Sequence, residues 1–263
     1  MVNINYLKNP FNYIGGKYKL LPQILPLFPK KIDKFVDLFG GGGEVSLNVN
    51  AKQVVYNDKC EPLVNIFRNL DSKFVDEVKE MIDTYKLNKF SKQEFLNLRS
   101  YYNTNLKDKL DRENAVVLYC LITHAFNYQI AFNKSREFNM PSGASRSYFS
   151  KSLEDKLVKY IEAIDKKNIS FYSSDFHNLN LDSPEFNDTF YYCDPPYLIT
   201  VGGYERDYFC KWSEDYEREL LNLLDIINSK GGKFALSNVL EHKGKSLSLI
   251  HISEPHATSL HLV

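Results

Sequence analysis

The sequence predicts an α/β protein built around a parallel β-sheet. Three observations lead to this class: short apolar runs typical of buried strands, glycines or turn residues at their ends, and helical periodicity between them. The runs with strand character lie at 34–39, 53–56, 169–172, 189–193 and 234–237. Because strands that alternate with helical segments usually pair in parallel, we expect one sheet that carries helices.

The first strand-like run leads into a glycine-rich loop. Four glycines at 40–43 follow Phe39, and residues 44–49 can open a helix. Such a loop at the carboxyl end of a strand lets the backbone approach a nucleotide-like cofactor. A dinucleotide fingerprint would need a glycine where Val45 stands, which favours a smaller adenosyl cofactor over a nicotinamide.

The second strand-like run ends at Asp58. A carboxylate at this position can accept hydrogen bonds from both hydroxyls of a ribose. An aspartate that merely caps a turn or helix is the alternative. Both interpretations stay open at the level of the sequence.

The stretch from about 60 to 165 interrupts the sheet. Phe67, Leu70 and Phe74 illustrate the helical spacing of its first part. Residues 127–150 are polar, aromatic and basic, and we interpret them as an exposed recognition segment. The predicted division is 1–60 and 166–245 for a catalytic domain, 61–165 for a helical insertion and 246–263 for an atypical tail.

The tetrapeptide Asp194-Pro195-Pro196-Tyr197 directly follows the strand-like run 189–193. Its two prolines end strand hydrogen bonding and fix the local backbone. An amino group extruded from a duplex could donate to the Asp194 carboxylate and the Pro195 carbonyl, which favours a more tetrahedral, more nucleophilic nitrogen without a metal. Tyr197 could stack on the same base. A plain turn after a buried strand is the alternative.

A helix and a further strand are expected after this tetrapeptide. Ser213 can cap the helix, whose first turn contains Glu214 and Asp215. Glycines at 231–232 can end it, before the strand-like run 234–237.

Four blocks in this order resemble the Dam-type, alpha-group adenine methyltransferases of the D12 class: residues 13–22, 37–43, 174–176 and 194–197. The resemblance extends from about residue 10 to about residue 245. It implies a Rossmann-like methyltransferase sheet with an inserted, mostly helical target-recognition domain. It also implies site-specific transfer of methyl from S-adenosyl-L-methionine to N6 of a flipped adenine in duplex DNA, with S-adenosyl-L-homocysteine as product and no metal.

The resemblance assigns roles to individual residues. Asp175 would accept from the amino group of the cofactor adenine, and Phe176 would pack on that ring. The implied cofactor-binding residues are Tyr13, Gly15, Gly16, Lys17, Asp37, Phe39, Gly40, Gly41, Gly42, Asp58, Asp175, Phe176 and Asp194. The implied catalytic residues are Asp194, Pro195, Pro196 and Tyr197.

The insertion contains a segment that resembles the one with which these enzymes read DNA. The implied DNA-binding residues are Asn127, Asn133, Lys134, Arg136, Asn139 and Arg146, whose basic and amide groups suit phosphates and base edges. A merely solvated basic loop is the alternative for Lys134, Arg136 and Arg146. Ala131 stands where many relatives carry an arginine, so the target sequence is left open.

Composition limits the possible partners. The formal net charge is zero, with 33 basic and 33 acidic residues, so DNA contacts should be local rather than due to bulk charge. The four cysteines form no CxxC pair and suggest neither a disulfide framework nor a zinc site. No signal peptide or membrane span is recognised. We expect a cytoplasmic monomer or weak dimer that acts on double-stranded DNA, with a separate cognate restriction endonuclease as a candidate partner.

Residues 246–263 differ in character from the rest of the chain and contain three of its six histidines. The hypothesis is that they are a cloning or frame-shift artefact, or a foreign sequence joined to a truncated enzyme. No further helix or closing pair of strands is expected there, and an exposed sheet edge could then weaken activity.

The sequence also allows functions other than DNA methylation. One is a DNA-binding protein of the same fold with impaired catalysis. Another is a methyltransferase that acts on RNA or on a protein amide, although the long basic and aromatic insertion favours duplex DNA. A nicotinamide oxidoreductase is the weakest, because it lacks the glycine and leaves the two prolines without a purpose.

Overall fold

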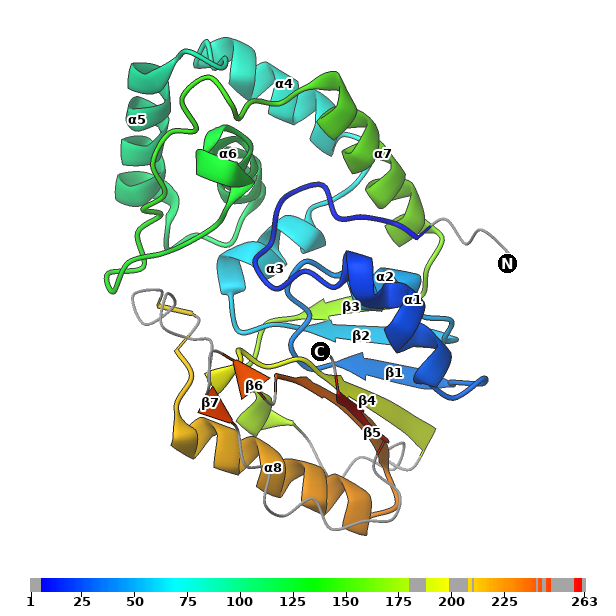
Figure 1. The fold of residues 1–263 in the computed structure, drawn as a ribbon. Helices are drawn as coiled ribbons and strands as arrows, with labels where there is room; N and C mark the ends of the chain where they lie inside the picture. The colour runs from blue at the N-terminus through cyan, green and yellow to red at the C-terminus, as the bar shows by residue number, and fades with distance from the viewer. Residues whose placement is uncertain are drawn as a thin grey trace.

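The computed structural model describes residues 6–179, 188–198, 208–209, 211–239, 241–242, 245–246 and 258–261. Within these residues, six strands form one sheet in the order β3-β2-β1-β4-β5-β8, and every neighbouring pair is parallel. The strands are β1 (Lys34–Asp37), β2 (Gln53–Asn57), β3 (Ile169–Tyr172), β4 (Thr189–Cys193), β5 (Lys233–Asn238) and β8 (Thr258–His261). The predicted α/β class and parallel sheet are therefore confirmed (Figure 1).

Side chains of the central strands alternate between two apolar layers, as the period of two in a strand requires. Phe35, Phe190 and Tyr192 pack with α1 (Leu21–Ile24) and α2 (Glu44–Asn48) on one face. Val36 and Tyr191 pack against α8 (Glu214–Ser229) on the other face. The sheet thus has a helical layer on each side.

The order of the strands determines where a site can form. β1 lies between β2 and β4, so the chain leaves β1 in one direction along the sheet and later returns on its other side. Asp37, at the end of β1, is in register with Tyr192 of β4. Open α/β sheets bind ligands at such a switch point, beyond the carboxyl ends of the strands.

The insertion is mostly helical, as predicted. Its helices are α3 (Glu61–Arg68), α4 (Phe74–Thr84), α5 (Lys92–Tyr101), α6 (Arg112–His124) and α7 (Lys151–Asp165). In Figure 1, α4–α7 gather at one end of the molecule and α8 lies at the opposite end. Every residue of α6 from Asn114 to His124 is buried, so this helix is the centre of the insertion.

The insertion and the sheet share one hydrophobic core. Phe67 of α3 stacks on Phe171 of β3, with ring centroids 5.6 Å apart and planes at 9°. The same ring meets Tyr56 of β2 edge-on at 5.1 Å. The predicted boundaries at 60 and 165 stay predictions, because no break in packing marks them.

The predicted cap of α8 is confirmed: the side chain of Ser213 accepts a hydrogen bond from the backbone of Tyr216. Asp111 and Ser150 cap α6 and α7 in the same way. Among the described residues, no helix is both long enough and apolar enough to span a bilayer.

The end of the chain differs from expectation. Strands β6 (Glu241–His242) and β7 (Lys245–Ser246) form a small antiparallel pair, and β8 lies parallel to β5 with Ala235 opposite Thr258. The expectation that no closing strand exists is therefore wrong for 258–261. The open edge of β5 offers unpaired backbone N–H and C=O groups, and many short segments can form hydrogen bonds with them. The side-chain pattern of a segment is therefore a poor predictor of whether it pairs there. The hypothesis of a foreign tail stays a hypothesis.

Candidate active site

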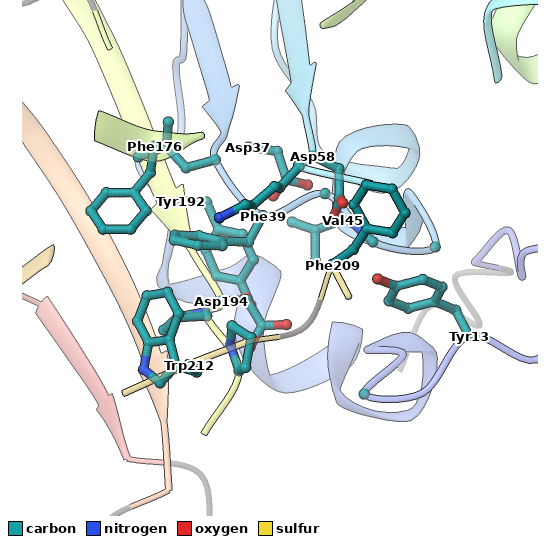
Figure 2. A pocket seen from close by; sticks show the side chains of 18 of the residues that line it. Tyr13, Asp37, Phe39, Val45, Asp58, Phe176, Tyr192, Asp194, Phe209 and Trp212 are labelled. Atoms are coloured by element: carbon teal, nitrogen blue, oxygen red, sulfur yellow. Dashed lines mark hydrogen bonds between the residues drawn. The ribbon is translucent and has the colours of Figure 1, made fainter. Parts of the chain in front are cut away.

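One cavity at the carboxyl ends of β1, β2 and β4 brings the four sequence blocks together (Figure 2). It is lined by all the residues predicted to bind the cofactor or the base: Tyr13, Gly15, Gly16, Lys17, Asp37, Phe39, Gly40, Gly41, Gly42, Asp58, Asp175, Phe176, Asp194, Pro195, Pro196 and Tyr197. Their roles stay predictions, but their placement in one cavity is what those roles require.

The glycine loop is held against two buried tyrosines. Tyr56 donates a hydrogen bond to the carbonyl of Gly41 at 2.7 Å, and Tyr160 donates to that of Gly42 at 2.8 Å. A Cβ atom at Gly40 would lie 2.2 Å from the Tyr56 ring, and Gly43 has a φ of +72°. The loop therefore needs glycine for close approach at 40 and for backbone conformation at 43.

Asp37 is a buried carboxyl group with one unused oxygen. Ser46 donates to its Oδ2 at 2.6 Å, whereas no described residue pairs with its buried Oδ1. Burial raises the pKa of Asp37 to about 7, and the nearby carboxylates of Asp194 and Asp58 add to the rise. The site thus presents a buried acceptor that a cation would stabilise.

Asp58 organises the loop around it. Its Oδ2 accepts from the amide of Gly41 and its Oδ1 from that of Cys60, both at 2.8 Å. Burial raises the pKa of Asp58, and these two amide donors oppose that rise. Asp58 thus stabilises the turn before α3, which was one of the two interpretations of the sequence, and its carboxylate keeps further lone pairs for a ribose.

Asp194 is engaged on both carboxylate oxygens by residues of its own chain. The Lys17 ammonium forms an ion pair with Oδ2, and the Tyr197 hydroxyl donates to Oδ1 at 2.8 Å. Lys17 also donates to the Gly15 carbonyl at 2.8 Å and lies 5.1 Å from the centroid of the Tyr197 ring. Each oxygen of Asp194 keeps a further lone pair that can accept a hydrogen bond from an amino group.

Burial and charge act in opposite senses on this pair. Burial raises the pKa of Asp194, and the Lys17 ammonium partly offsets the rise. Burial by itself lowers the pKa of Lys17, but the Asp194 carboxylate outweighs it, so that the pKa of Lys17 lies well above its ordinary value. Each member of the pair thus stabilises the charged form of the other.

One wall of the cavity is aromatic. Phe39 lies 5.6 Å from both Phe176 and Trp212, measured between ring centroids. Figure 2 shows Phe176 and Trp212 on one side of the cavity and Tyr13 on the other. The Trp212 indole donates to Glu217 at 2.6 Å, which fixes its orientation. This wall suits the flat face of a heteroaromatic ring.

Sequence reasoning missed several lining residues: Glu44, Lys59, Phe209, Lys211, Trp212 and Tyr216. One signal was available, because Trp212 is the single tryptophan of the chain and directly precedes the Ser213 cap. Glu44 accepts from the amide of Tyr18 at 2.8 Å and so fastens the amino-terminal block to the glycine loop.

The predicted DNA-binding residues lie outside this cavity, in the segment between α6 and α7. Four of them are exposed: Asn127, Lys134, Asn139 and Arg146. Asn133 instead stabilises its own turn, accepting from the amides of Ser135 at 2.9 Å and Glu137 at 3.0 Å.

Arg136 is also committed to internal contacts. Its Nη2 donates to Glu61 at 2.7 Å, and its guanidinium lies 5.8 Å from the Tyr208 ring centroid and 5.9 Å from that of Phe209. Phe132 of the same segment meets Phe209 edge-on at 5.3 Å. Because Phe209 lines the cavity, the recognition segment touches the wall of the candidate active site.

Among the residues that the structure describes, no group of three or more histidine, cysteine or acidic side chains is arranged to hold a metal ion.

Comparison with known proteins gives several similar sequences. The chain is 43% identical to the type II methyltransferase M.FokI of Planomicrobium okeanokoites over 273 residues, covering 98% of this chain and 41% of the relative. It is 43% identical to the modification methylase StsI of Streptococcus sanguinis, covering 93% and 37%, and 32% identical to the modification methylase LlaI of Lactococcus lactis subsp. lactis, covering 94% and 39%. The chain thus spans about two fifths of the length of these relatives.

The family model for D12 class N6 adenine-specific DNA methyltransferases matches residues 13–258, which include all four blocks. The match also reaches into the segment that was expected to be foreign. On this match over most of its length, the chain belongs to the D12 class N6 adenine-specific DNA methyltransferase family.

Proposed function

We propose that this protein is a site-specific methyltransferase that moves the methyl group of S-adenosyl-L-methionine to N6 of an adenine extruded from duplex DNA. One observation carries the proposal: the carboxylate of Asp194 lies in the same cavity as the glycine loop, Asp37 and the aromatic wall. A group able to bind an exocyclic amine is therefore next to a site suited to an adenosyl cofactor.

The residues present fit S-adenosyl-L-methionine. The unused Oδ1 of Asp37 is suited to the ammonium of the methionine part, since a buried acceptor without a partner is costly. Asp58 is suited to the ribose, and Asp175 with Phe176 is suited to the amino group and face of the adenine. When bound, the cofactor would supply an electrophilic methyl group on its sulfonium.

The chain itself would prepare the nucleophile. The Asp194 carboxylate and the Pro195 carbonyl would accept the two amino hydrogens, which orients the nitrogen lone pair and favours its tetrahedral form. The resting contacts of Asp194 with Lys17 and Tyr197 keep this carboxylate charged and oriented before the base arrives. Tyr197 would then stack on the base, and the prolines would keep the acceptors fixed.

Duplex DNA would be held by the segment between α6 and α7. Lys134 and Arg146 are exposed basic residues, and Asn127 and Asn139 offer exposed amide groups. With a net charge of zero, such local contacts must provide the phosphate binding. We further propose that the enzyme acts in the cytoplasm as a monomer or weak dimer, as the modification partner of a separate restriction endonuclease.

The test is transfer of labelled methyl from S-adenosyl-L-methionine to mixed-sequence duplex DNA, followed by digestion to nucleosides and mapping of the labelled site. We expect N6-methyladenine within one short sequence, and labelling at least about 100-fold slower with Asp194→Asn. Label on cytosine, or on RNA or protein in place of DNA, would overturn the proposal. So would the absence of any transfer by a folded protein that binds the cofactor.

A further inference from the structure

Asp175 belongs to a connected group of charged side chains that extends beyond the lining of the cavity. His177 is at its centre, on the short 3-10 helix η5 (Phe176–Asn178) that follows β3. Asp175 and Lys59 line the cavity, whereas His177 and Glu219 do not. None of the roles argued above uses His177.

His177 connects two structural elements through both of its ring nitrogens. Its Nδ1 is in hydrogen-bond contact with Oδ1 of Asp175, and its Nε2 lies 2.8 Å from Oε2 of Glu219 on α8. The backbone amide of His177 also donates to Asp175 Oδ1, at 3.2 Å. We call this arrangement the His177 bridge: Asp175, His177 and Glu219.

The chemistry of the bridge selects one protonation state. Both carboxylates accept hydrogen bonds, and an imidazole donates from both nitrogens only when it is protonated. A neutral ring would leave one carboxylate facing a lone pair. The geometry with both contacts is thus that of an imidazolium between two carboxylates.

The other oxygen of Asp175 is held from the opposite side. Lys59 forms an ion pair with its Oδ2 at 2.6 Å. The Lys59 ammonium also lies 5.1 Å from the ring centroid of Tyr216 and 3.5 Å from its hydroxyl oxygen. Asp175 is therefore fixed between cations on both sides, with its direction set relative to Phe176 and the cavity.

Packing restricts the histidine ring as well. Its centroid lies 3.9 Å from that of Phe176, and the Tyr216 ring meets it edge-on at 5.3 Å. Rotation of the imidazole would disturb the aromatic wall, because Phe176 also contacts Phe39 and Trp212. The bridge is thus coupled to the part of the cavity that suits an adenine.

We propose that His177 is a positioning residue for cofactor binding: its protonated ring holds Asp175 and α8 in place, so that cofactor affinity falls when the ring loses its proton. This inference rests on the proposed function, which places the cofactor adenine beside Asp175 and Phe176. It adds that cofactor affinity depends on pH, and that His177, a residue outside the cavity, causes this dependence.

The direction of the effect follows from the charges around the ring. Burial lowers the pKa of His177, but Glu219 and Asp175 outweigh it, and the net shift is upward. The titratable groups that face the ring are Asp175 on its own element and Glu219 and Tyr216 on α8, with Lys59 behind Asp175. A raised histidine pKa means that the bridge is complete at low pH and is lost as pH rises through the shifted value.

The test measures binding of S-adenosyl-L-homocysteine by calorimetry to the full chain and to His177→Gln, from about pH 6 to about pH 9. For the unmodified protein we expect the dissociation constant to rise about fivefold to tenfold between neutral pH and about pH 9, on the alkaline side of the Asp37 titration. His177→Gln should bind weakly at every pH and lose this alkaline dependence. Circular dichroism checks that the variant is folded.

Two further variants distinguish a positioning role of His177 from a general loss of fold stability. Glu219→Gln keeps an acceptor but removes a charge, so it should move the alkaline loss to lower pH while low-pH affinity is retained. Asn178→Ala, on the same short helix, should behave like the unmodified protein. With S-adenosyl-L-methionine, His177→Gln should raise KM for the cofactor and leave kcat within about twofold.

Unchanged affinity and an unchanged pH profile in His177→Gln would overturn this inference while leaving the proposed function intact. Failure of the folded, unmodified chain to bind the cofactor product at any pH would overturn both.

Discussion

Lys17 and Asp194 form an ion pair inside the cavity, although one residue lies in the amino-terminal block and the other directly after β4. Their side chains are 7% and 14% exposed. Such a pair keeps a carboxylate charged in a place where burial alone would favour its neutral form. Under the proposed function, the acceptor for the incoming amine is thus held in place by Lys17 before DNA binds.

Replacing Lys17 by methionine should shift the dependence of the reaction on pH. Methionine fills similar space but leaves the Asp194 carboxyl buried without its cation, so the pKa of Asp194 should rise further. Activity requires the charged carboxylate and is lost as pH falls through that pKa, so the acid limb of kcat/KM should move to higher pH. The variant should also lose about 3–5 kcal/mol of stability, as expected when one member of a buried pair is removed.

The control for this variant is Lys19→Met, which changes an exposed lysine of the same block. Its rate profile and melting temperature should match those of the unmodified protein. Superimposable acid limbs for Lys17→Met and the unmodified protein would mean that Lys17 does not set the charge of Asp194.

Asp194 and Tyr197 should differ in what their substitution removes. Asp194→Asn keeps the shape but not the charge, and should lower the single-turnover rate at least about 100-fold. Tyr197→Phe removes the hydroxyl that donates to Asp194 and keeps the ring, so it should cost only a few-fold. Tyr197→Ala should be far slower; equal rates for Tyr197→Phe and Tyr197→Ala would contradict a stacking role.

Asp37 should make cofactor binding depend on pH in the sense opposite to the His177 bridge. Its pKa of about 7 means that the carboxyl is partly protonated near neutrality, whereas a bound ammonium requires it charged. Affinity should therefore weaken as pH falls below about 7, and binding at lower pH should release protons. Calorimetry in buffers of different ionisation enthalpy measures that release.

Two substitutions test this assignment. Asp37→Asn should lower affinity about 10–100-fold above neutrality and abolish the proton release. Ser46→Ala removes the donor to Asp37 Oδ2 and should move the acid limb to higher pH. Proton release that persists in Asp37→Asn would assign the acid limb to another group.

In the recognition segment, substitution of an exposed residue should weaken DNA binding, whereas substitution of an internally hydrogen-bonded residue should lower stability. Lys134→Gln removes an exposed charge, so it should weaken DNA binding and reduce the slope of log affinity against log salt by about 0.9. Asn133→Ala removes the acceptor for the Ser135 and Glu137 amides and should lower the melting temperature. Binding titrations at several salt concentrations distinguish the two; an unchanged slope in Lys134→Gln would exclude a phosphate contact.

Much of the fold could be predicted because the strands are short, apolar and punctuated by turn residues. The strand-like run 34–39 corresponds to β1 (Lys34–Asp37), and 53–56 to β2 (Gln53–Asn57). Once these strands are parallel neighbours, their carboxyl ends meet, and the residues that follow them must lie close together. The predicted site residues of the glycine loop and of 194–197 share a cavity for this reason.

Other features could not be read from the chain because they depend on contacts between distant segments. Nothing local to Lys17 indicates that it pairs with Asp194. Arg136 can bind a phosphate or a carboxylate equally well, and only the fold reveals that Glu61 lies next to it. The pairing of β8 reflects an open strand edge, which leaves little trace in side-chain pattern.

The stacking of Phe67 on Phe171 has a consequence for how this enzyme could acquire a new target sequence. Because α3 and α6 belong to the same core as β2 and β3, excising residues 61–165 would strip the apolar cover from that part of the sheet. Deletion of residues 61–165 should therefore unfold the remaining sheet rather than leave a smaller folded protein. On the proposal that the segment between α6 and α7 binds DNA, a change of specificity would come from its exposed positions, where replacements leave the shared core untouched.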